Sequence, residues 1–187
     1  MPRLMILIAS ARPGRVGLPL AEWFRGRVET HGAFEVDWAD MAEIALPLMD
    51  EPNHPRLQRY EHEHTKAWSA RVAAADAFAF VLPEYNHGYN AVVKNALDYL
   101  HNEWKHKPVG IVSYGGISAG LRGVVTLKPT LSCLQLVAAT NAVSISNVAQ
   151  FIDDDGVFQA NDTLQEVSLA MLDELVALDG ALRTLRG

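Results

Sequence analysis

The sequence predicts a doubly wound α/β sandwich, in which helices cover both faces of a parallel sheet. Short, nearly continuous apolar runs have the composition of strands that are buried on both faces. Segments with helical periodicity lie between these runs, and strand and helix alternate along the whole chain without a repeat. With 187 residues, the chain has the size of one well-buried domain, and we expect residues 1–187 to form a single domain.

Four apolar runs are expected to form the central strands. A fifth run, residues 34–40 ("FEVDWAD"), alternates apolar and polar residues and suits an edge strand. In the five-stranded version of this fold the spatial order of the strands is 2-1-3-4-5, which we expect here. The central runs are Leu4 to Ala9, Ala77 to Leu82, Val109 to Val112 and Ala142 to Ile145.

Apolar residues at spacings of three and four predict the helices. The last helix is the clearest, because capping residues Asn161 and Asp162 precede a stripe from Leu164 to Leu185. The connection "IALPLMDEPNHP" has three prolines and reads as a surface segment. The other expected helices cover residues 20–28, 57–75, 92–104 and 121–136, the last of which Pro129 should kink or split.

Composition excludes several classes of protein. The formal charge is −6, so a general affinity for nucleic acid is not expected. No apolar run approaches the roughly 20 residues that span a bilayer, and the start of the chain reads as a buried strand, so we expect a cytoplasmic protein with no membrane partner. The single cysteine, Cys133, fits a reducing compartment. Positive charge is nevertheless concentrated in residues 1–21, which contain three arginines and no acid.

Three unusual loops follow the first, third and fourth expected strands. They are "SARPGRVG" (10–17), "PEYNHGY" (83–89) and "SYGGISAG" (113–120). Ligands of doubly wound folds bind beyond the carboxyl ends of the strands, where the winding reverses between strands 1 and 3. We therefore expect these loops to converge on one site.

The chemistry of the loops suggests a ligand with two different ends. A serine, two arginines and a helix N-terminus in the first loop suit a phosphate, although a plain turn with solvated arginines would have the same residues. The other two loops offer tyrosine, asparagine, glycine and backbone amides, which suit the edge and open face of a flat heteroaromatic ring such as isoalloxazine.

Together the loops resemble those of the NADPH-dependent FMN reductases, a flavodoxin-like family of three-layer α/β/α sandwiches. "PEYNHGYNAVVKNALDY" resembles the family's P-E-Y-N signature, "SARPGRVG" its phosphate loop and "SYGG" its third flavin loop, over residues 4–145. Arg15 replaces a serine of the family pattern, Asn90 stands where proline is common, and His87 adds a titratable group. The resemblance implies an FMN phosphate at Ser10, Arg12, Arg15, Val16 and Gly17, a ring edge at Pro83, Glu84, Tyr85 and Asn86, and a second ring boundary at Ser113, Tyr114, Gly115 and Gly116.

The same resemblance implies an enzyme. NADPH or NADH would deliver hydride to non-covalently bound FMN, and a small acceptor such as a flavin, quinone, azo compound or metal ion would then be reduced. No side chain is expected to act as a catalytic acid or base, and no metal is expected. Arg15 and Arg122 are candidates for contacts with the phosphates of the nicotinamide dinucleotide. The family also implies a homodimer or homotetramer.

Three alternatives remain at this point. An electron carrier of the same fold would bind FMN without oxidising a nicotinamide. "GISAG" around Ser118 matches the nucleophile elbow of serine hydrolases, although all seven histidines precede it. His62 and His64 suggest a metal site, but their spacing of two residues suits a solvated polar face better.

Overall fold

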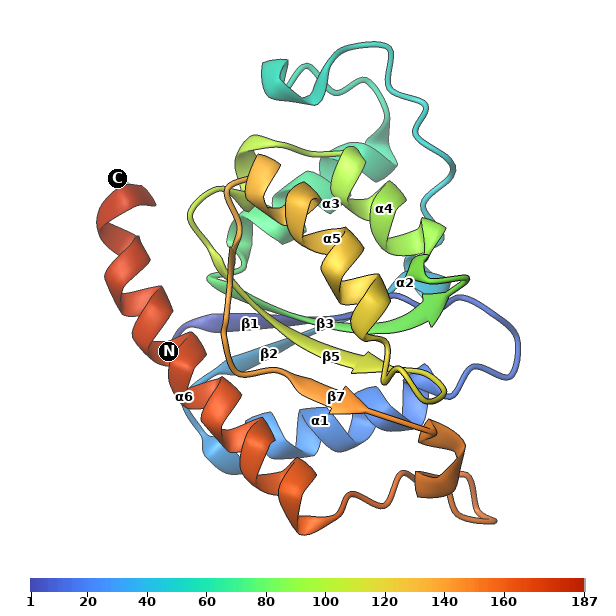
Figure 1. The fold of residues 1–187 in the computed structure, drawn as a ribbon. Helices are drawn as coiled ribbons and strands as arrows, with labels where there is room; N and C mark the ends of the chain where they lie inside the picture. The colour runs from blue at the N-terminus through green and yellow to red at the C-terminus, as the bar shows by residue number, and fades with distance from the viewer. Residues whose placement is uncertain (187) are drawn as a thin grey trace.

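In the computed structural model, which describes residues 1–186, a parallel sheet lies between two layers of helices (Figure 1). The sheet order is β2-β1-β3-β5, and two short strands, β6 and β7, share the fifth position because both pair with β5. This confirms the expected order 2-1-3-4-5 and the edge position of β2. The strands are β1 (Arg3–Ile8), β2 (Glu35–Asp40), β3 (Ala77–Tyr85), β5 (Pro108–Tyr114), β6 (Val137–Ala138) and β7 (Val143–Ile145).

The fifth position is divided because the chain leaves the sheet between β6 and β7. There the backbone N–H groups of Thr140 and Asn141 donate to the carboxylate of Glu174, each at 2.7 Å, instead of to a strand. Glu174 belongs to the last helix, so this helix satisfies the backbone where the sheet cannot.

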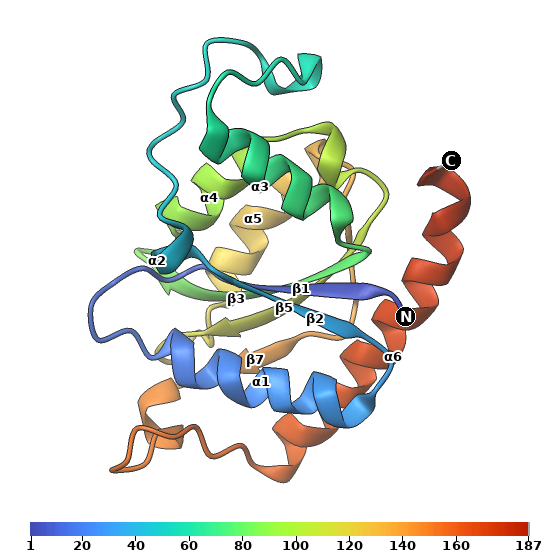
Figure 2. The ribbon, with the colours of Figure 1, turned by 180° about the vertical axis from the view of Figure 1, so that it is seen from behind.

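The helices divide into two groups, as Figures 1 and 2 show from opposite sides. Helices α1 and α6 cover one face of the sheet, and α3, α4 and α5 cover the other. The α-helices are α1 (Gly17–His31), α2 (Met41–Ile44), α3 (Glu63–Ala74), α4 (Ala91–Asp98), α5 (Leu121–Cys133) and α6 (Asp162–Arg186). Short 3₁₀ turns are η1 (Pro55–Leu57), η2 (Asn102–Trp104) and η3 (Val148–Phe151).

Each face of the sheet carries its own hydrophobic core. Met5 and Leu7 of β1 face α3, α4 and α5, whereas Leu4 and Ile6 face α1 and α6, and all four are fully buried. Because successive strand residues point to opposite faces, a strand covered on both sides has no polar position. This explains why the central strands read as continuous apolar runs.

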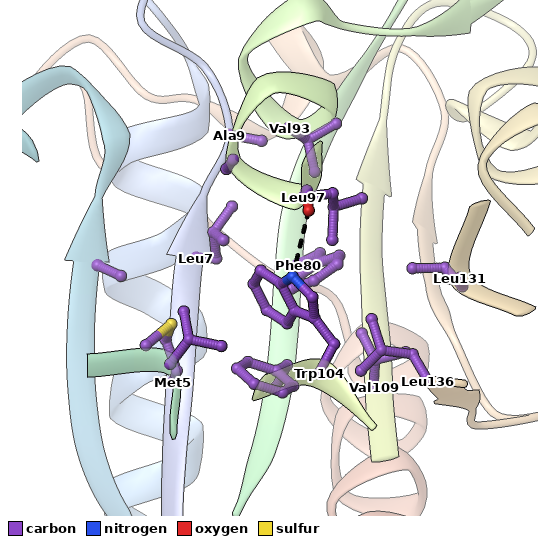
Figure 3. Close-up of a cluster of buried hydrophobic side chains, with 14 of the residues drawn as sticks. Met5, Leu7, Ala9, Phe80, Val93, Leu97, Trp104, Val109, Leu131 and Leu136 are labelled. Atoms are coloured by element: carbon purple, nitrogen blue, oxygen red, sulfur yellow. Dashed lines mark hydrogen bonds between the residues drawn. The ribbon is translucent and has the colours of Figure 1, made fainter. Parts of the chain in front are cut away.

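Three helix predictions need correction. The helix expected over residues 57–75 begins only at Glu63, and Leu57 ends the separate turn η1. Helix α4 ends at Asp98, and Trp104 lies in η2, yet its indole remains buried and donates from Nε1 to the Leu97 carbonyl at 3.3 Å (Figure 3). The apolar residues between 92 and 104 are therefore buried, but they do not belong to one helix. Helix α5 is not split, since it continues through Pro129 while Leu127 and Leu131 pack onto the core. No helix among the described residues is long and apolar enough to cross a membrane.

Candidate functional site

The loops after β1, β3 and β5 meet at the carboxyl edge of the sheet, where they surround a cavity of about 130 Å³. The convergence expected from strand order is therefore present. The cavity wall consists of Ser10, Arg12, Arg15, Val16, Pro83, Glu84, Tyr85, Tyr114, Gly115 and Val148. Of the other predicted residues, Gly17 begins α1, Asn86 lies in the turn after β3, Ser113 lies in β5, and Gly116 follows Gly115 in the same loop.

The first loop combines several groups that are suited to an anion. Helix α1 begins at Gly17 with no side-chain cap and no acidic residue in its first turn, so its N–H groups and its positive dipole end remain available. The Arg12 side chain is exposed and, among the residues that the structure describes, it makes no hydrogen bond or ion pair. Ser10 is almost fully buried beside them. A guanidinium, a hydroxyl and a helix N-terminus together suit a phosphate.

Arg15 lines the same cavity, and its guanidinium group is paired with a carboxylate of β2. Its Nη1 and Nη2 atoms bind Oδ1 and Oδ2 of Asp40 at 2.6 and 2.5 Å, and Nη1 also donates to the Ser10 carbonyl at 2.6 Å. The hydrogen bond with Asp40 raises the pKa of Arg15. Burial acts to raise the pKa of Asp40, but its bonds with Arg15 and the Ala42 N–H hold that pKa below its ordinary value of 3.8. The two side chains therefore form a charged pair at neutral pH.

The second loop is a tight hairpin that sequence analysis did not identify. Strand β3 continues to Tyr85 and pairs antiparallel with β4 (Gly88–Tyr89). The two residues between them, Asn86 and His87, have φ angles of 51° and 67°, the positive values that type I′ hairpin turns require. The turn holds the ring of Tyr85 at the rim, where its hydroxyl lies 3.3 Å from the Ser10 Oγ. Polar residues gather here because the hairpin needs them and because the rim faces solvent.

Glu84 links the second loop to the third. Its Oε2 accepts hydrogen bonds from the Ser118 hydroxyl at 2.8 Å and from the Arg122 N–H at 3.1 Å, while the Arg122 guanidinium lies 3.4 Å from Oε1. Burial acts to raise the pKa of Glu84, but these bonds hold it below its ordinary value. Both predicted residues Glu84 and Arg122 thus contact each other in the structure.

The same contacts remove the basis of the hydrolase alternative. The Ser118 hydroxyl donates to a carboxylate, and among the described residues no histidine forms a hydrogen bond with it. A nucleophile elbow places its serine on a strained turn, whereas the positive φ angles of this loop fall at Ala119 and Gly120.

The third loop forms the opposite wall. Tyr114 is 4% exposed, and burial raises its pKa to about 12, so its hydroxyl is protonated. A Cβ atom added at Gly17 would collide with this hydroxyl, which explains why α1 begins with glycine. Ser113 is fully buried and donates to the Ala119 carbonyl at 2.8 Å, so it shapes the loop from inside.

Val148 is a cavity residue that sequence analysis missed. Its N–H donates to the Gly115 carbonyl at 3.1 Å, and the Asn147 N–H donates to the Gly116 carbonyl at 2.9 Å. The loop after β7 therefore fixes the backbone of the third loop. No local motif marks it, and only its position after the fifth strand could have drawn attention to it.

Asn90 is a second residue whose role was missed. Its Nδ2 donates to the Ala9 carbonyl at 3.0 Å, and its Oδ1 caps α4 by accepting from the Val93 N–H at 3.0 Å. The Ala9 N–H donates to Val81, so the next donor of this parallel ladder would be residue 83. That residue is Pro83, which has no N–H. Asn90 supplies the missing donor and joins the first loop to the second.

The histidines of residues 60–64 both contact Asp50. His62 and His64 are stacked, and His64 Nε2 lies 3.0 Å from Asp50 Oδ1. Within residues 1–186 there is no group of three or more metal-ligating side chains.

A larger cavity, of about 720 Å³, lies at the opposite edge of the sheet between the ends of α3 and α6. Its arginines 183 and 186 are already paired with Asp179, and Lys107 donates to carbonyls at the end of α3. The smaller cavity is the better candidate site, because its exposed Arg12 has no protein partner among the described residues.

Comparison with known proteins agrees with this architecture. The sequence pattern of the family described as NADPH-dependent FMN reductase matches residues 2–150. The chain is 32% identical to the NAD(P)H-dependent FMN reductase ntnL of a Nectria species, over 95% of this chain and 97% of that protein. It is also 42% identical to the NAD(P)H-dependent FMN reductase C4B3.06c of Schizosaccharomyces pombe, over 64% of this chain and 60% of that protein.

A solved structure gives the same fold. The flavoenzyme NAD(P)H:(acceptor) oxidoreductase FerB of Paracoccus denitrificans superimposes with a TM-score of 0.76 at 21% identity, covering 95% of this chain and 98% of that one. The flavodoxin-like fold expected from the sequence is therefore confirmed. The extent of the family match and the full-length similarity to ntnL show that the chain belongs to the NADPH-dependent FMN reductase family.

Proposed function

We propose that this protein is an FMN-dependent oxidoreductase that takes electrons from NADPH or NADH and passes them to a small acceptor. The observation that carries the proposal is the single cavity that three loops share. Its wall includes the exposed Arg12, whose side chain has no partner among the described residues, beside the uncapped start of α1, and it also includes Tyr85 and Gly115. A ligand with both a phosphate and a flat ring would use both kinds of group.

The residues of the first loop fit the FMN phosphate. The Arg12 guanidinium, the Ser10 hydroxyl and the backbone N–H groups at Val16 and Gly17 would donate to its oxygens. A dianion there would also interact favourably with the dipole of α1, which has 15 residues.

The remaining residues fit the ring of the flavin. A cavity of about 130 Å³ is smaller than a typical ligand pocket of roughly 300–1,000 Å³. The ring would therefore extend beyond it, held by the hairpin from Pro83 to Asn86 and by Gly115 and Gly116. A Cβ atom added at Gly116 would have no atom within 4 Å, so the loop is open at this position and would leave room for a nicotinamide or an acceptor.

When bound, FMN would supply the redox chemistry, because the isoalloxazine accepts hydride and releases electrons. The protein would supply position and hydrogen bonds. No side chain is required as an acid or base: Glu84 is held as a carboxylate by Ser118 and Arg122, and Tyr114 keeps its proton.

An electron carrier is the second candidate, because it would use the same fold and cofactor. The arginine-bearing first loop favours the enzyme. Steady-state oxidation of NADPH by the FMN-loaded protein, with a quinone as acceptor, separates the two. Catalytic turnover supports a reductase, whereas bound FMN that NADPH does not reduce supports a carrier.

We further propose a single domain that assembles as a homodimer or homotetramer in the cytoplasm. The lone cysteine supports the reducing compartment, and the family pattern supports the assembly. Sedimentation of the purified protein measures the assembly directly.

A further inference from the structure

The Arg15–Asp40 pair connects the two ends of the first loop. Asp40 is the last residue of β2 and lies beside Ile8 in the ladder, immediately before the loop begins. Arg15 lies at the far end of the loop, two residues before α1. The side chains are 14% and 2% exposed, so the pair lies largely out of solvent.

Arg15 also holds the inside of the loop. Its Nη1 atom donates to the Ser10 carbonyl at 2.6 Å, and its backbone N–H donates to the Arg12 carbonyl at 3.1 Å. One residue therefore fixes the backbone at Ser10 and Arg12, the two positions whose side chains are proposed to contact the phosphate. Asp40 in turn is fixed by the Ala42 N–H at 2.9 Å.

These contacts leave little of Arg15 for a ligand. Three of its five N–H donors are engaged, and the carboxylate of Asp40 cancels its charge. Arg12 is different, because its side chain is exposed and has no partner among the described residues. The two arginines of the loop, which look equivalent in the sequence, have separate tasks.

We propose that Asp40 is a positioning residue for the cofactor: it holds Arg15 as a brace across the first loop, so that Ser10, Arg12 and the start of α1 are arranged for a phosphate that Arg15 does not contact. This inference rests on the proposed function, since it concerns how FMN is held. Pre-arranging a loop increases affinity because less conformational entropy is lost on binding.

Asp40→Asn tests whether Arg15 is a brace or a phosphate ligand, because the two roles predict opposite changes in the affinity for FMN. Asparagine keeps an acceptor for the Ala42 N–H but loses the charge that holds Arg15. If Arg15 is a brace, loss of its pairing with Asp40 weakens FMN binding by about tenfold to a hundredfold, which is the range for charge-assisted hydrogen bonds. If Arg15 were instead a phosphate ligand restrained by Asp40, the variant would free a positive charge and bind FMN as well or more tightly, which would overturn the proposal.

The readout is the dissociation constant of FMN and of riboflavin, each measured by flavin fluorescence. Riboflavin lacks the phosphate, so its affinity should stay unchanged in Asp40→Asn. An equal loss for both ligands would show a general structural effect and would also overturn the proposal. Asp37→Asn is the matched control, because it removes another ion pair of β2, the one with Arg71, away from the loop.

Arg15→Lys guards against a folding defect in Asp40→Asn. Lysine keeps the charge but cannot bridge Asp40 and Ser10 together, so FMN binding should again fall by about tenfold or more. Near-normal affinity in Arg15→Lys would contradict the brace. The double variant Arg15→Lys/Asp40→Asn should bind FMN no more weakly than the weaker single variant, and additive losses would contradict a shared role. Wild-type protein that binds no FMN would instead refute the proposed function.

Discussion

Replacing Asn90 with alanine should destabilise the fold and loosen the site at the same time. The side chain is 3% exposed and joins the end of β1 to the start of α4 through two hydrogen bonds. Alanine leaves the Val93 N–H without its cap. It also leaves the Ala9 carbonyl without a donor, since Pro83 cannot provide one.

The expected loss of unfolding free energy is about 2 to 4 kcal/mol. Removal of an N-cap costs about 0.5–2 kcal/mol, and an unsatisfied buried carbonyl costs about 1–3 kcal/mol. Asn90→Pro should lose slightly less, because φ at this position is −82° and proline restricts the unfolded chain. Proline cannot restore either hydrogen bond.

Urea unfolding followed by circular dichroism measures the loss. Asn95→Ala is the matched control on the same helix, because Asn95 also makes two hydrogen bonds, one with Pro47 and one with Met49, but from a half-buried position. We expect it to cost about 1 kcal/mol. If Asn90→Ala costs no more than this control, Asn90 does not replace the hydrogen-bond donor that Pro83 lacks.

Three further predictions concern the first loop and its surroundings. Arg12→Ala should weaken FMN binding by about tenfold to a hundredfold, in a fluorescence titration, and leave the affinity for riboflavin unchanged. Gly17→Ala should cost about 1–3 kcal/mol in urea unfolding, because its Cβ collides with Tyr114, whereas Gly26→Ala in open space on the same helix should stabilise by about 0.5–1 kcal/mol. Because the pKa of Asp40 is lowered by folding, its carboxylate stabilises the fold above pH 3.8, and this stabilisation is lost as the pH falls below that value. Asp40→Asn should therefore lose less unfolding free energy than the wild type as the pH is lowered, measured by acid unfolding. An unchanged pH dependence would contradict this prediction.

The fold could be predicted because segments that are buried on both faces must be apolar along their whole length. Leu4 to Ala9 is continuous and apolar because β1 is covered on both faces. Parallel strands place their carboxyl ends at one edge, so the order of strands was enough to bring the loops at 10, 83 and 113 together.

The contacts inside the site could not be predicted in the same way. Arg15 and Asp40 are 25 residues apart, and Glu84 and Ser118 are 34 apart, so no local pattern links them. The apolar spacing through Trp104 predicted a longer helix, because a buried indole beyond α4 follows the same period. The role of Asn90 depends on the position of Pro83 in the hydrogen-bond ladder between β1 and β3, which the sequence does not give.

Equilibrium titration of FMN into the purified protein, followed by addition of NADPH without oxygen, tests the central claim most directly. The three-loop site predicts a single tightly bound FMN per chain whose visible absorbance is bleached by NADPH, and weaker binding in Arg12→Ala. Protein that leaves FMN free in solution, or that binds it equally well without Arg12, would contradict the site described here.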